Sequence, residues 1–214
     1  MEIILTGIEY SGTTTMAQAI TDWYKKETGD SGYGLHDHFK VPHVVHAALT
    51  EEEQRLVLAL SPRIKEAVQR HQLEYHVQPT FFTDGNHSVT GLHIEDAVYG
   101  PLYWGYGGPG ELGDRSVVSR QIEDRVLEDG TDTVLILMKA SRDVIAGRMR
   151  ENPHESSPMQ EKDIDHVLQR FQEEYDKSRI PNKFTLDTST ATVEETVADY
   201  AEKLEPYLSE SDRL

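Results

Sequence analysis

Cysteine is absent from the 214-residue sequence. Its absence excludes disulfides, zinc sites with cysteine ligands, iron–sulfur clusters and thiol nucleophiles, and it suits a reducing cytoplasm. Long apolar runs are also missing: the first run, at residues 3–5, is too short for a signal peptide, and no stretch of 18 apolar residues occurs. We therefore expect a soluble, cytoplasmic protein without a membrane partner.

Positive charge is scarce. Lysine and arginine number 21 against 38 aspartate and glutamate residues, which gives a formal net charge of -17. A field of this sign repels nucleic acids and anionic membrane surfaces, so we expect no nucleic-acid partner. The length suits one α/β domain over residues 1–214 and leaves little room for a second core.

Short apolar runs alternate with helical patterns along the chain. Strands are predicted at 3–6, 33–38, 80–83, 133–138 and 183–187, and helices at 16–26, from 50 to about 61, 63–76, in part of 89–103, and at 116–127, 142–150, 161–178 and 193–208. This alternation favours a parallel sheet with helices on both faces, that is, a three-layer α/β domain. Ligands of such sheets bind outside the carboxyl ends of the strands.

The segment after the first predicted strand, Gly7-Ile8-Glu9-Tyr10-Ser11-Gly12-Thr13-Thr14-Thr15, follows the phosphate-loop (P-loop) pattern G-x-x-x-x-G-K-[ST] except at the lysine. Backbone N–H groups there would approach phosphate, and the Thr14 hydroxyl would ligate magnesium. The predicted phosphate-binding residues are Gly7, Glu9, Tyr10, Ser11, Gly12, Thr13, Thr14 and Thr15. The alternative is a plain strand-to-helix turn.

This loop resembles that of the P-loop nucleoside and nucleotide kinases, and the thymidylate-kinase-like group most closely. The resemblance extends to the order of elements over most of the chain. It implies a P-loop NTPase domain with a short lid near residues 142–160, and a homodimer. It also implies magnesium-dependent transfer of the γ-phosphoryl group of ATP to a small acceptor, a nucleoside or a nucleotide.

Two aspartates follow predicted strands. His36-Asp37-His38-Phe39-Lys40 is similar to the D-x-F-[YK] segment of uridine and nicotinamide-riboside kinases, in which the aspartate takes the proton of the accepting hydroxyl. Asp84 would lie after a strand at 80–83, near magnesium or the acceptor. Thymidylate kinases usually have Asp-Arg there, whereas Gly85 follows here, so the arginine for a phosphorylated acceptor is missing. Strand-end acids and Asp-Gly turns also occur without function.

Thr13 leaves the loop without the lysine that normally contacts the β- and γ-phosphates. Candidates to supply the missing charge are Arg142, Arg148 and Arg150 of the lid-like segment, together with Lys40. The arginines are equally explained as solvated helix residues. If no cation replaces the lysine, the chain is a nucleotide-binding module that has lost transfer, or a slow ATPase.

Three further patterns carry less weight. The histidines at 36, 38, 43 and 46 lack the spacing of a known metal motif, although a metal-dependent hydrolase stays an alternative. Residues 105–110 match G-x-G-x-x-G by letter but lack the flanking strand and helix of a dinucleotide site. The aromatic residues Tyr99, Tyr103, Trp104 and Tyr106 either form a stacking wall for a base or pack in the core.

Overall fold

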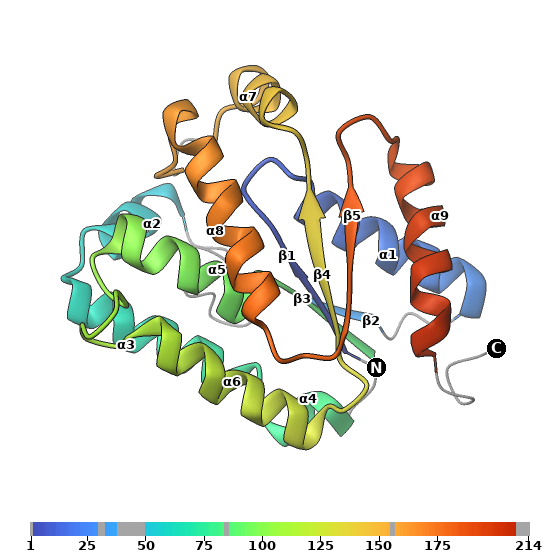
Figure 1. Cartoon of the computed structure of the whole chain (residues 1–214), viewed down its shortest axis with the longest axis horizontal. Helices are drawn as coiled ribbons and strands as arrows, with labels where there is room; N and C mark the ends of the chain where they lie inside the picture. Colours follow the sequence, from blue (N-terminus) through green and yellow to red (C-terminus); the bar gives the residue numbers. More distant parts are fainter. Residues whose placement is uncertain (1, 30–32, 38–49, 84–85, 155–156, 209–214) are drawn as a thin grey trace.

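The computed structural model describes residues 2–29, 33–37, 50–83, 86–154 and 157–208. It contains one five-stranded sheet in the order β2-β3-β1-β4-β5, and every neighbouring pair is parallel (Figure 1). The strands are β1 (Glu2–Thr6), β2 (Tyr33–Asp37), β3 (Asn86–Thr90), β4 (Val134–Lys139) and β5 (Asn182–Asp187). The central strand β1 lies between β3 and β4. The connection after β1 runs to β2 on one side of it, and the connection after β3 runs to β4 on the other side. This change of direction opens a crevice at the carboxyl end of β1.

Helices cover both faces of the sheet, as the alternation predicts (Figure 1). One layer holds α1 (Thr13–Thr28) and α9 (Val193–Leu204), and the other holds α3 (Pro62–Tyr75), α5 (Leu92–Tyr99), α6 (Arg115–Asp129) and α8 (Ile164–Lys177). The remaining helical segments are α2 (Glu51–Leu58), α4 (Pro79–Thr83), α7 (Arg142–Glu151), a π-helical turn (Gly100–Trp104) and short 3-10 turns (Glu161–Asp163 and Glu205–Tyr207). No helix in these ranges is both long and apolar enough to cross a membrane.

The residues of the central strands alternate between two cores. Ile3 and Leu5 of β1 pack with α1 and α9, whereas Ile4 packs with α5, α6 and α8. Because successive strand side chains point to opposite faces, five buried residues in a row need helices on both sides. The same reasoning predicts β4 as a buried parallel strand, and this prediction is confirmed.

The residues predicted to start helices at 50 and near 62 do so in the structure. Thr50 and Glu53 form the expected capping box at the start of α2. Pro62 is the first residue of α3, where its missing N–H costs no helical hydrogen bond. Pro62 therefore marks the break between α2 and α3, as the sequence predicts.

The third strand differs from the prediction. Residues 80–83 belong to the helix α4, and the strand is β3, which begins at Asn86. The β-branched and aromatic run at 80–83 favours a strand, but it follows Pro79, which suits a first helical turn. Asp84 itself lies outside the described residues, and no strand precedes it, so the basis for placing it at a strand's carboxyl end is lost. That end is formed by Thr90.

A buried ion cluster joins the second helical layer. Arg115 of α6 is 2% exposed; its Nε donates to Asp96 of α5 at 2.6 Å, and its Nη1 donates to Glu66 of α3 at 3.0 Å. The Tyr106 hydroxyl also donates to Asp96, at 2.7 Å, and the guanidinium lies 4.7 Å from the Tyr106 ring centre. Tyr106 and Tyr99 are buried in the core, which favours packing over a stacking wall for these two residues.

Candidate functional site

The P-loop sequence adopts a tight turn between β1 and α1. A side chain at Gly7 would come within 2.7 Å of the Met138 carbonyl oxygen and of the Ser11 hydroxyl, so only glycine fits there. Gly12 has φ +93° and is the N-cap of α1, with no side-chain hydrogen bond to the first turn. The N-terminal N–H groups of α1 therefore face the space in front of the loop without a capping side chain.

That space is a cavity of about 620 Å³ at the carboxyl edge of the sheet. It is bounded by residues after β1, β3 and β5 and by the end of α7, which lies above the strand tips in Figure 1. The lining residues are Gly7, Glu9, Tyr10, Gly12, Thr13, Thr14, Thr15, Met16, Thr90, Glu95, Arg148, Glu151, Asn152, His154, Thr188, Ala191, Thr192, Val193 and Thr196. All the predicted phosphate-loop residues except Ser11 line it. Ser11 is buried below, and its carbonyl oxygen accepts from the Thr188 hydroxyl at 2.9 Å.

Of the three arginines predicted for the lid, only Arg148 reaches the cavity among the described residues. Its Nη1 donates to the Tyr10 carbonyl oxygen at 2.8 Å, and its Nη2 donates to the Thr188 carbonyl oxygen at 2.8 Å. Arg142 instead pairs with Asp165 at 3.2 Å, and Arg150 pairs with Glu161 at 3.0 Å, both at exposed positions. Arg148 thus places a positive charge beside the loop that lacks its lysine.

A second contact joins the segment that follows α7 to the P-loop. The His154 ring stacks on Tyr10 with ring centres 4.3 Å apart, and the His154 backbone N–H donates to the Tyr10 hydroxyl at 2.9 Å. The His154 Nδ1 lies 3.5 Å from a Glu9 carboxylate oxygen. Tyr10 has φ +68°, an uncommon backbone conformation for a residue with a side chain. These contacts with His154 hold Tyr10, the middle residue of the loop, in place.

Two buried carboxylates line the cavity, and only one of them, Glu9, is predicted from the sequence. Glu9 and Glu95 line the cavity and are 7% and 8% exposed. The Tyr99 hydroxyl accepts from the Glu9 backbone N–H at 3.2 Å. Burial raises the pKa of Tyr99, and the negative charges of Glu9 and Glu95 raise this pKa further. Glu95 follows β3 directly in the first turn of α5, so placing β3 at 86–90 is the signal that would have found it.

The donor set suits a magnesium ion that arrives with phosphate. The Thr14 hydroxyl and the Glu95 carboxylate are oxygen donors on the cavity wall. In the described ranges, no group of three or more acidic, histidine or cysteine residues could hold a metal by itself. Mg²⁺ characteristically takes one or two protein oxygens and completes its shell with substrate phosphates and water. The side chain of Asp37 is not among those described; its backbone ends β2 in register with Thr90 of the cavity wall.

Comparisons with known proteins agree on the fold. No family model and no curated protein sequence matches this chain. Among solved structures, YorR protein from Bacillus subtilis in complex with phosphorylated GDP matches with a TM-score of 0.62 at 18% identity, covering 98% of this chain and 99% of that one. Thymidylate kinase from Candida albicans matches with a TM-score of 0.60 at 13% identity, covering 96% and 91%. Thymidylate kinase from Ehrlichia chaffeensis matches with a TM-score of 0.57 at 16% identity, covering 96% and 98%. The chain therefore has a P-loop, thymidylate-kinase-like α/β fold along nearly its whole length.

Proposed function

We propose that this protein binds ATP with Mg²⁺ and transfers the γ-phosphoryl group to a small hydroxyl-bearing acceptor, as a nucleoside or nucleotide kinase. The observation that carries the proposal is the P-loop itself. It lies between the central strand and α1, its glycines meet the steric demands of the turn, and the uncapped start of α1 faces a cavity of about 620 Å³. Oriented backbone N–H groups at such a helix start attract anions.

The charge of the cavity accounts for a need for magnesium. Its described lining contains three carboxylates, Glu9, Glu95 and Glu151, but one arginine and no lysine. A triphosphate entering this field is repelled unless a divalent cation accompanies it. Mg²⁺ would supply charge neutralisation of the transferring group, and Thr14 and Glu95 are the described residues placed to hold it.

Arg148 is the residue we assign to the role of the missing lysine. It reaches the cavity from α7 and donates to the backbone carbonyl oxygens of Tyr10 in the P-loop and of Thr188 after β5, so its guanidinium is held in place before substrate binds. Preorganised charge stabilises a transition state without reorganisation during reaction. Asp37 would orient or deprotonate the acceptor, since its strand ends beside Thr90. His154 stacks on Tyr10 and lies beside the Glu9 carboxylate, and we assign it the role of holding the segment after α7 against the P-loop.

A second function is favoured by one observation, the neutral Thr13 at the first position of α1. Arg148 already donates to carbonyl oxygens of the loop and of Thr188, which reduces what it can offer to phosphate. On this reading the protein binds a nucleotide and closes its lid but does not transfer the phosphoryl group, or hydrolyses ATP slowly.

The test follows the γ-phosphate of labelled ATP in the presence of Mg²⁺ and a pool of nucleosides, nucleoside monophosphates and small hydroxylated metabolites. Label appearing in one acceptor supports the kinase. Label released only as inorganic phosphate, or ATP binding without turnover, supports the second function. The absence of ATP binding contradicts both.

Thr13→Lys separates the two functions further. A kinase that uses Arg148 should gain less than about threefold in turnover, because the charge is already supplied. An impaired module should bind ATP about tenfold more tightly, the gain typical of one charge-assisted hydrogen bond. Gln18→Lys, at an exposed position of the same helix that does not line the cavity, is the matched control for added positive charge alone.

A further inference from the structure

Arg148 meets the chain at the end of β5 through one residue, Thr188. We infer, resting on the proposed function, that Thr188 is a positioning residue: it holds one end of the Arg148 guanidinium, so that the remaining N–H groups bind two oxygen atoms of one phosphate of the nucleotide. Thr188 follows Asp187, the last residue of β5, and lines the cavity together with Arg148. The contact joins residues 40 positions apart, so no local sequence pattern predicts it.

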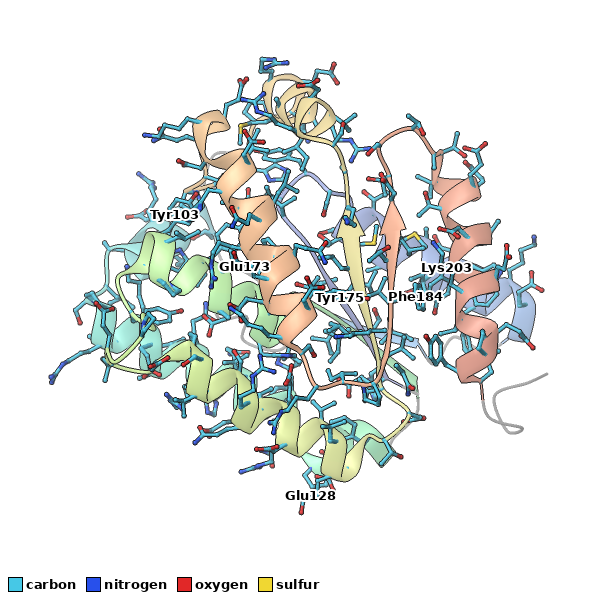
Figure 2. The ribbon with its side chains drawn as sticks, viewed as in Figure 1. Tyr103, Glu128, Glu173, Tyr175, Phe184 and Lys203 are labelled. Carbon is cyan, nitrogen blue, oxygen red and sulfur yellow. The ribbon has the colours of Figure 1, made fainter. Side chains whose placement is uncertain are left out.

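The backbone at Thr188 is held before any ligand binds. The edge strand β5 pairs with β4, and the Thr188 N–H continues this pairing by donating to the Lys139 carbonyl oxygen at 2.8 Å. On the other side, the Lys203 ammonium donates to the Thr185 carbonyl oxygen at 3.0 Å, and Phe184 packs against the core that contains α1 and α9. Figure 2 shows Phe184 and Lys203 between β5 and α9. The strand that carries Thr188 is therefore fixed from both sides.

The Thr188 hydroxyl connects Arg148 to the P-loop. It donates its one proton to the Ser11 carbonyl oxygen at 2.9 Å, and the Lys139 carbonyl oxygen is farther away, at 3.3 Å. Both carbonyl oxygens can only accept, so the lone pairs of the hydroxyl are left for the Arg148 Nη1, which donates to them at 3.1 Å. A side chain without a hydroxyl at this position lacks the acceptor that the guanidinium uses.

The guanidinium of Arg148 keeps part of its donor capacity. Nη1 donates to the Thr188 hydroxyl and to the Tyr10 carbonyl oxygen, and Nη2 donates to the Thr188 carbonyl oxygen. Arginine has five N–H groups in a fixed plane, and within the described residues the Nε–H and the second N–H of Nη2 have no hydrogen-bond partner. Because Nη1 and Nη2 together face Thr188, the two unused N–H groups lie along the side of the guanidinium next to Nε.

This unused pair suits a phosphate. Two parallel N–H groups of an arginine bind two oxygens of one phosphate, and such charge-assisted bonds are stronger than those between neutral groups. Arg148 lines the same cavity as Gly12 and Thr13, so a phosphate held at the start of α1 shares that space with the guanidinium. The lysine of a standard P-loop is a point charge that needs no such orientation. An arginine in its role does, and Thr188 supplies the orientation.

The experiment titrates ATP with Mg²⁺ into the whole protein by calorimetry. Thr188→Val keeps the branched shape and removes the hydroxyl, and we expect it to weaken ATP binding about tenfold, as for one hydrogen bond to a charged group. Thr188→Ser keeps the hydroxyl as an acceptor and should stay within about twofold of the wild type. Thr190→Val, the matched control, makes the same chemical change at an exposed residue outside the cavity lining and should leave ATP binding unchanged.

Arg148→Met separates positioning of the arginine from support of the P-loop. Adding Thr188→Val to Arg148→Met should change ATP affinity by less than about twofold, because the hydroxyl has already lost the group that it positions. The same loss in both backgrounds overturns the inference, since Thr188 would then act through Ser11 and the P-loop alone. Unchanged ATP binding by Thr188→Val overturns it as well.

Thermal melting shows whether each variant folds. If Thr188→Val does not fold, Thr188→Ala removes the hydroxyl without a new methyl group and takes its place in the same comparisons. The absence of ATP binding by the wild type overturns the proposed function and this inference with it. ATP binding with equal losses in the two backgrounds leaves the proposed function standing and removes only the positioning role of Thr188.

Discussion

Replacing Glu2 by glutamine should make the protein less sensitive to alkaline pH. Glu2 begins β1, is 2% exposed, and its carboxylate oxygens have no hydrogen-bond partner in the part of the chain that the structure describes. Burial raises the pKa of Glu2 to about 8 from its ordinary value of 4.5, and the nearby Asp132 adds to the increase. The folded protein therefore binds a proton here more tightly than the unfolded chain does.

The sign and size of the effect follow from proton linkage. Between pH 4.5 and pH 8 the folded state holds the proton and the unfolded state has lost it, so the free energy of unfolding falls as the pH rises. One pKa unit corresponds to about 1.4 kcal/mol, so the whole interval corresponds to a loss of about 5 kcal/mol. Glu2→Gln has no charge to bury, and its advantage over the wild type should grow by about 4 kcal/mol from pH 5 to pH 8.5.

The assay is urea unfolding followed by circular dichroism at several pH values and constant ionic strength. Only the difference between variant and wild type is interpreted, because other carboxylates contribute equally to both. Glu128→Gln, an exposed change, should stay parallel to the wild type throughout. A constant difference between Glu2→Gln and the wild type across this range would refute the reasoning, since it would mean that Glu2 is ionised in the folded protein.

Three other outcomes can be measured. Arg115→Met should lower the free energy of unfolding by about 3–5 kcal/mol in urea, because Asp96 and Glu66 lose their buried cation, and adding Asp96→Asn should restore part of it. Gly12→Ala and Gly110→Ala should each lower the free energy of unfolding by about 1–2 kcal/mol, because both glycines have positive φ. Only Gly12→Ala should also weaken ATP binding in calorimetry. Equal effects of the two variants on ATP binding would contradict the P-loop assignment. Raising NaCl from 0.05 M to 1 M should increase the melting temperature by several degrees, since salt screens the repulsion of a net charge of -17; a lower melting temperature would show that this repulsion is unimportant.

The parts of the fold predicted correctly are those in which local chemistry and burial agree. The P-loop is recognisable because its glycines are demanded by the turn itself, and β4 because a strand buried on both faces needs an unbroken apolar run. The capping box at Thr50 is a short-range hydrogen-bond pattern that the sequence contains in full.

The third strand was missed because its residues do not look like a central strand. Asn86-His87-Ser88-Val89-Thr90 has one aliphatic residue, and its position between β2 and β1 comes from tertiary pairing that no local pattern shows. Because the strand was predicted at 80–83, the acid expected at its carboxyl end was Asp84. Glu95, in the first turn of the helix after the actual strand, was therefore not considered. The choice of Arg148 over Arg142 and Arg150 likewise depends on the ion pairs that the other two form with α8 and its preceding turn.

The cavity is assembled from segments that lie far apart in the sequence. Its floor comes from residues 7–16, and part of its wall comes from residues 188–196, while α1 and α9 pack together in one core that contains Met16 and Tyr200. A ribosome releases the first of these segments long before the last. The nascent chain therefore carries a phosphate loop with an incomplete wall, and the complete cavity forms only after nearly the whole described chain has been synthesised.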